Sequence, residues 1–88
     1  MNKQRRKELA DILAKLEDLE NLRAEIKERL EDVRNEEQEA LDNLPEAFQT
    51  GERGEQMQEY IDALDEAIDN LDEFDCESIS YPLEDIIG

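Results

Sequence analysis

The stretch "LADILAKLEDLENLRAEIKERLEDV" (Leu9–Val33) places an apolar residue at almost every third or fourth position. This spacing is typical of a helix with one apolar face, because an α-helix turns once in about 3.6 residues. With Leu9 as heptad position a, the a positions are Leu9, Leu16, Arg23, Leu30, Glu37 and Leu44, and the d positions are Ile12, Leu19, Ile26, Val33 and Ala40. The pattern predicts one long helix over residues 5–43 with a coiled-coil-like seam at a and d.

A second, shorter helix is predicted over residues 55–75. Its apolar residues step by four and three along the chain: Met57, Ile61, Leu64, Ile68 and Leu71. Pro45 ends the first helix, and Gly51 and Gly54 allow the chain to reverse within the connection 44–54, where Phe48 is expected to cap the core. The tail 76–88 reads as one closing turn, with Pro82 near its start.

These elements predict a single all-α domain over residues 1–88: a long helix and a shorter antiparallel helix in a coiled-coil-like hairpin, with a short C-terminal turn. A first helix of about 39 residues spans roughly 58 Å, whereas a second of about 21 residues spans roughly 31 Å. An apolar stripe on the N-terminal half therefore needs another cover: Leu9, Ile12, Leu13, Leu16, Leu19 and Leu22. The tail could fold over part of it, but we favour a homodimeric bundle that joins two such stripes.

The chain carries 27 acidic and 10 basic residues, for a net charge of −17. This charge argues against non-specific binding to nucleic acids or anionic membranes, which both require Lys and Arg. No segment is apolar enough to span a membrane. A single cysteine, Cys76, cannot form an internal disulfide, which fits a cytoplasmic protein, and we expect its side chain to be a small buried hydrophobe.

The motifs of enzymes and metal sites are missing from the sequence. There is no histidine, and "TGERGEQ" (Thr50–Gln56) lacks the spacing and the lysine of a phosphate-binding loop. "DNLDEFDCESIS" (Asp69–Ser80) lacks the central glycine of a calcium-binding EF-hand loop. We therefore expect no catalytic residues, no metal site and no cofactor.

Acidic residues dominate the second half of the chain. Residues 52–88 hold 13 acids and one base, Arg53. The predicted partner-binding residues are Glu55, Glu59, Asp62, Asp65, Glu66, Asp69, Asp72 and Glu73. A row of like charges is most simply a solvated face that keeps a small protein soluble. It could instead resemble a phosphate backbone and bind a basic groove on another protein. The alternative function is that of a structural or adaptor protein, which would act through the apolar N-terminal stripe.

Three segments carry a resemblance to a known group of proteins: "EEQEALDNLPE" (Glu36–Glu46), "ERGE" (Glu52–Glu55) and "LDEAIDNLDE" (Leu64–Glu73). Together they resemble small acidic uncharacterised proteins of phages and prophages. In size and charge the chain is also similar to anti-CRISPR and anti-restriction inhibitors that mimic DNA. The resemblance implies a protein that acts in the cytoplasm of a host bacterium, where it binds a basic nucleic-acid-binding surface of a host protein and inhibits it. No activity is assigned to the group, so the resemblance implies no catalytic residue.

Overall fold

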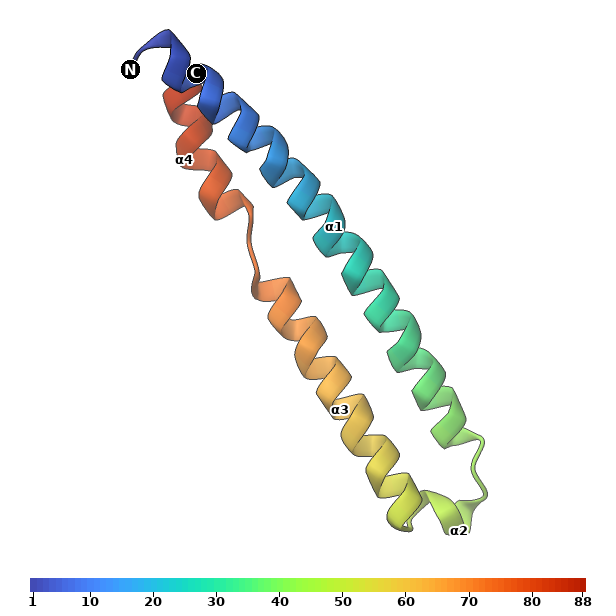
Figure 1. Ribbon diagram of the computed structural model, residues 1–88. Coiled ribbons are helices and arrows are strands. Elements are labelled where there is room, and N and C mark those ends of the chain that lie inside the picture. The colour runs from blue at the N-terminus through green and yellow to red at the C-terminus, as the bar shows by residue number, and fades with distance from the viewer. The chain divides into compact units, whose positions relative to one another are not determined.

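The computed structural model describes all residues from Met1 to Gly88 and contains only helices (Figure 1). In chain order these are α1 (Lys3–Asp42), α2 (Glu46–Gln49), α3 (Glu52–Glu73) and α4 (Glu77–Ile87). The predicted all-α class is confirmed, while hairpin packing and dimer formation stay predictions. None of the helices combines the length and the apolar character needed to cross a lipid bilayer.

The chain divides into two compact units, and α1 contributes to both. Residues 26–73 form one unit, which we call the acidic unit. Residues 1–25 and 74–88 form the other, which we call the terminal unit. Each unit is described by itself below.

In the acidic unit, α3 lies beside the C-terminal part of α1, and two ion pairs join the helices (Figure 1). Ile61 of α3 is fully buried, and Leu41 of α1 is only 9% exposed. Several other apolar side chains are half-buried: Leu30, Leu44, Met57, Leu64, Ile68 and Leu71. The hydrophobic interior of this unit is therefore thin, and only one large side chain is removed completely from water.

The connection between α1 and α3 contains the short helix α2 and a close backbone contact at Gly54. The Pro45 carbonyl accepts hydrogen bonds from the N–H groups of Phe48 at 2.8 Å and Gln49 at 3.2 Å. α3 begins at Glu52, three residues before the predicted start. Gly54 is buried, and a Cβ atom there would lie 2.1 Å from the Gln49 carbonyl oxygen.

Gly54 is thus required for space and not for an unusual conformation, since Gly88 is the only residue with a positive φ. This differs from the expectation that glycine flexibility reverses the chain. Phe48 is 56% exposed, so the prediction that it caps the core is wrong. At this end of the unit the chain instead brings backbone close to backbone, between Gln49 of α2 and Gly54 of α3.

In the terminal unit, α4 lies beside the N-terminal part of α1 and ends near its first turns (Figure 1). The prediction of a single closing turn is wrong, because α4 is an 11-residue helix that contains Pro82. This helix begins at Glu77, well before Pro82. Asp75 explains the start at Glu77, since its Oδ1 accepts a hydrogen bond of 2.9 Å from the Glu77 N–H. The less exposed positions of this segment follow at helical spacing: Cys76, Ser80, Leu83 and Ile87.

The face that α1 turns to its neighbours differs from the predicted seam. Apart from Gln38, the less exposed residues are the a positions and the residues four places after them: Leu9, Leu13, Leu16, Glu20, Arg23, Lys27, Leu30, Arg34, Glu37, Leu41 and Leu44. The d positions Ile12, Leu19, Ile26 and Val33 are 37–50% exposed, so they do not belong to the contact between α1 and its neighbours within the chain. The reason is that Glu20, Lys27 and Arg34 find opposite charges and can therefore face inward.

The predicted dimer stripe is divided by this change of register. Leu9, Leu13 and Leu16 are half-buried, and the last two line the groove beside α4. Ile12, Leu19 and Leu22 stay exposed, so only this half of the stripe is available to a partner. The tail thus covers part of the stripe, as one of the two alternatives anticipated.

Replacement of Gly54 by alanine should destabilise the acidic unit. The new methyl group would collide with a backbone carbonyl, which cannot rotate away, and we expect a loss of about 1–3 kcal/mol in the free energy of unfolding. Urea unfolding followed by circular dichroism measures it. Gly51→Ala is the control, because a Cβ atom there meets its nearest neighbour at 3.4 Å and should leave stability unchanged or slightly higher. Equal stability of the two variants would contradict the steric role of Gly54.

Candidate partner-binding surface

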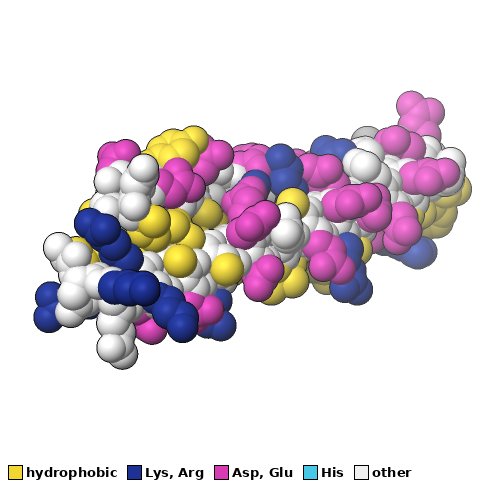
Figure 2. Space-filling model, turned by 90° about the horizontal axis from the view of Figure 1, so that it is seen from above, with side chains coloured by type: hydrophobic (Ala, Val, Ile, Leu, Met, Phe, Trp, Pro, Cys, Tyr) yellow, Lys and Arg dark blue, Asp and Glu magenta, His cyan; other side chains and the backbone are white.

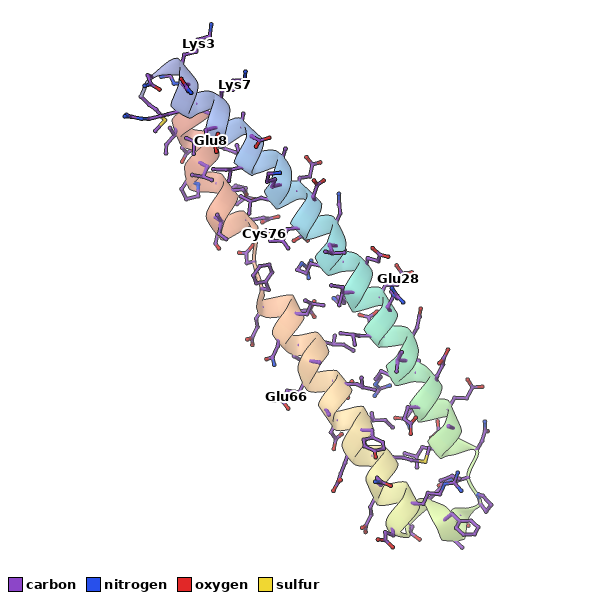
Figure 3. The ribbon with its side chains drawn as sticks, viewed as in Figure 1. Lys3, Lys7, Glu8, Glu28, Glu66 and Cys76 are labelled. Carbon is purple, nitrogen blue, oxygen red and sulfur yellow. The ribbon has the colours of Figure 1, made fainter.

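Acidic side chains occupy much of the face seen in Figure 2. By its sequence, α3 carries six acids that form a row. The row steps by three or four residues and is called here the acidic row: Glu55, Glu59, Asp62, Glu66, Asp69 and Glu73. All six side chains are exposed. Figure 3 shows Glu66 on the side of α3 that points away from α1. The acidic row is therefore open to solvent along the length of α3.

Two of the eight predicted partner-binding residues lie outside the acidic row. Asp65 Oδ1 accepts a bond of 2.9 Å from Arg34 Nε, and Asp72 Oδ1 lies 2.7 Å from Lys27 Nζ. Both side chains are also 43–47% exposed, so their predicted role toward a partner stays a prediction. The structure thus separates two acids that pair with α1 from six that have no such partner, a distinction that sequence spacing alone did not provide.

The acidic row has no basic partner within the chain. No member of it forms an ion pair, and its one hydrogen bond joins Gln58 Nε2 to Asp62 Oδ1 at 3.0 Å. Arg53 is the only base in α3, and it lines a shallow depression with Glu52, Glu55 and Glu59. Glu73 lies in the last turn of α3, where the helix dipole disfavours negative charge. The repulsion between the carboxylates of the acidic row is therefore not offset by a base within the chain.

The terminal unit contains a groove between α1 and α4 with an apolar floor and carboxylates around it. The groove has a volume of about 450 Å³ and is lined by Ala10, Leu13, Ala14, Leu16, Glu17, Glu20, Cys76, Glu77, Ser80 and Glu84. Arg23 donates to Glu20 from Nε at 2.9 Å and from Nη2 at 2.6 Å. These hydrogen bonds lower the pKa of the Glu20 carboxyl.

Cys76 is 4% exposed, which confirms the prediction of a buried cysteine. Burial raises the pKa of its thiol, and the nearby Glu20 carboxylate raises the pKa further. A thiol with a raised pKa is mostly protonated near neutral pH and is a poor nucleophile. No group of three or more His, Cys, Asp or Glu side chains is arranged to hold a metal ion.

No protein-family model matches the chain, and no curated protein or solved structure matches it either. The function is therefore inferred from the charges and contacts of the chain itself.

The two kinds of aspartate on α3 should respond in opposite ways to neutralisation. Asp69→Asn removes repulsion from Glu66 and Glu73, at about 0.2–0.5 kcal/mol for each pair, and should stabilise the protein. Asp65→Asn removes the partner of Arg34 and should lower the free energy of unfolding relative to Asp69→Asn by up to about 1 kcal/mol. Urea unfolding at low ionic strength measures the difference. A more stable Asp65→Asn variant would show that the ion pair does not hold α3 to α1.

Cys76 should react slowly with a disulfide reagent in the folded protein. Because the pKa of its thiol is raised, the thiolate fraction below that pKa is smaller than in the unfolded chain. The reaction rate, followed by absorbance from pH 7 to 10, should reach half its maximum at a higher pH in buffer than in concentrated urea. Equal midpoints in the two solvents would contradict the buried environment of Cys76.

Proposed function

We propose that the chain is a phage or prophage inhibitor that binds the basic nucleic-acid-binding surface of a host protein through the acidic row of α3. The observation that carries the proposal is that six exposed carboxylates on one helix have no Lys or Arg partner. A basic groove would supply the missing positive charges and exclude the nucleic acid that normally occupies it.

The charge density of α3 supports mimicry of a nucleic-acid strand. The 22 residues of α3 include nine acids and one base. At 1.5 Å per residue the helix is about 33 Å long, which gives one acid in about 3.7 Å. A single strand of B-form DNA carries one charge in about 3.4 Å along the axis. Asp65 and Asp72 pair with bases of α1, so seven acids remain, or one in about 4.7 Å. A groove that tracks one phosphate strand would thus meet a charge density of the same order on α3.

The cost of the acidic row argues that it does more than keep the chain soluble. Its five successive like-charge neighbours destabilise the helix by about 1–2.5 kcal/mol before screening by salt. A surface with interspersed lysines would be soluble without this cost. In a complex with a basic surface, the same repulsion would be relieved, and the unscreened field would accelerate association.

Neutralisation of the acidic row should abolish binding to basic host proteins. The variant Asp62→Asn, Glu66→Gln, Asp69→Asn, Glu73→Gln removes four of the six charges and should leave the fold intact or more stable, since repulsion is relieved. The measurement is a low-salt pull-down from a bacterial lysate, followed by displacement of the retained proteins with duplex DNA. We expect the parent chain to retain proteins that DNA displaces and the variant to lose them.

A matched control changes four exposed acids on α1 within the same unit: Glu28→Gln, Asp32→Asn, Glu36→Gln and Glu39→Gln. It alters the net charge by the same amount, so binding through the acidic row should persist in this variant. Equal loss in both variants would indicate a response to net charge alone. Retention by the α3 variant of the same proteins as the parent would show that the mimicry proposal is wrong.

The exposed Ile12, Leu19 and Leu22 favour a second candidate, a structural or adaptor protein that acts through apolar contacts. Ionic strength separates the two functions, because binding through the acidic row should weaken steeply between about 50 and 300 mM salt, whereas apolar binding should not. Capture that survives high salt and is lost in Leu19→Glu would support the adaptor function instead.

A further inference from the structure

The terminal unit has a second exposed surface, which is apolar. Its members are Ile12 and Leu19 of α1 and Ile79 and Ile86 of α4, which are exposed by 37%, 40%, 47% and 43%. We call these four residues the apolar flank. In Figure 2, hydrophobic side chains are visible beside the Lys and Arg side chains of the N-terminal region.

The four residues lie on the same side of the α1–α4 pair. Each directly precedes a less exposed residue, namely Leu13, Glu20, Ser80 and Ile87. Each side chain is therefore rotated by about 100° about its helix axis, in the same direction along the chain, from the residue that faces the other helix. Because α4 runs opposite to α1, equal rotations about the two axes bring all four side chains to one side. The flank is thus one surface built from two helices.

The α1 border of the apolar flank is charge-balanced. On the solvent side of Ile12 and Leu19, the next positions of α1 are Glu8, Lys15 and Leu22, and Arg5 precedes them on the row itself. Two copies of a chain with a net charge of −17 repel each other over most of their surface, and α4 carries three acids and no base. A second copy therefore meets the least repulsion along the α1 part of this flank.

We propose that the apolar flank is the interface between two copies of the chain, related by a two-fold axis that passes at Ile12, with the two α1 helices antiparallel. This register places Glu8 opposite Lys15 of the second copy, and the symmetry repeats the pair. It also places Leu22 opposite Met1 of the second copy, both of which are exposed. It also places Leu19 opposite Arg5 of the second copy, whose aliphatic stem would cover the leucine while its charged end stays in solvent. The two Glu8–Lys15 pairs make the charges at the border of α1 self-complementary about Ile12, as a two-fold interface requires.

The positions of Ile79 and Ile86 on α4 are compatible with the same two-fold axis. Cys76 lies next to Glu20, and because the helices are antiparallel, Ile79 lies beside position 17 of α1 and Ile86 beside position 10. The midpoint of these two positions is within about 2 Å of Ile12 along the helix axis. The axis therefore brings Ile79 to within about 4.5 Å, along the helix axis, of Ile86 of the second copy. One axis buries the flanks of both helices in a four-helix arrangement of two terminal units.

The first test is the mass in solution. Sedimentation equilibrium of the whole chain at tens of micromolar should give twice 10.3 kDa. Ile12→Glu places two carboxylates on the axis and should give a monomer with unchanged helix content. Val33→Glu is the matched control, since Val33 is 50% exposed on the same heptad row but outside the terminal unit, and it should stay dimeric. A monomeric parent chain, or monomers from both variants, would overturn the proposal.

Charge reversal tests the register without altering the apolar residues. Glu8→Lys and Lys15→Glu should each weaken the dimer by about 3- to 30-fold, because each creates two like-charge contacts. The double variant should return to within about 3-fold of the parent. Additive losses in the double variant would rule out the pairing of these two residues.

Cross-linking tests the position of the axis. Ile12→Cys should form a disulfide-linked dimer under mild oxidation, whereas Leu19→Cys should not, because the two copies of position 19 are 14 residues apart along the antiparallel helices, or about 21 Å. The parent chain, with only the buried Cys76, should stay unlinked. Cross-linking of Leu19→Cys in preference to Ile12→Cys would refute the axis. None of these substitutions alters the acidic row, so failure of the dimer and failure of the proposed function are distinguishable.

Discussion

Two ion pairs between α1 and α3, together with the buried Ile61, set which side of α3 remains in solvent. Lys27 and Arg34 lie seven residues apart on α1, and they contact Asp72 and Asp65, which lie seven residues apart on α3. Exposed or half-exposed pairs of this kind each contribute only about 0.2–1 kcal/mol. Their larger effect is orientation, because a helix is rigid and the position of two side chains fixes the direction of all others. The acidic row is the set of carboxylates that this orientation leaves outside.

The leucine and isoleucine periodicity of the sequence was sufficient to predict the long helix, the shorter helix and the all-α class. It failed on the seam, because hydrophobic patterning treats Lys27 and Arg34 as outward residues, while a buried or half-buried base is acceptable when a carboxylate meets it. It also failed on α4, because Pro82 was taken as a start signal and the capping role of Asp75 lay seven residues earlier.

The prediction of the partner-binding residues was limited in the same way, because it used only the spacing of residues within one helix. Spacing on α3 identified the acids of the row, but only contacts with α1 could separate Asp65 and Asp72 from their neighbours. Gly54 was recognised for its flexibility, whereas its function depends on the approach of the Gln49 carbonyl, which no local pattern encodes.

Charge and apolar exposure are distributed between the two units. The acidic unit holds 17 acids and 4 bases, for a net charge of −13, and the terminal unit carries the remaining −4. Exposed apolar side chains occur in both units, but those of two helices share one side only in the terminal unit. Electrostatic recognition and apolar association can therefore use separate parts of one short chain, so that a change in one surface need not disturb the other.

Pro82 also bears on the order in which the molecule assembles. It lies inside α4, lacks the N–H that would bond to the Ser78 carbonyl, and makes an 11-residue helix unfavourable by itself. Residues 77–87 therefore gain their helical form mainly from docking against α1. We therefore expect α4 to form after the part of α1 on which it docks and to open before it, so that the C-terminal segment should exchange its amide hydrogens before the N-terminal half of α1.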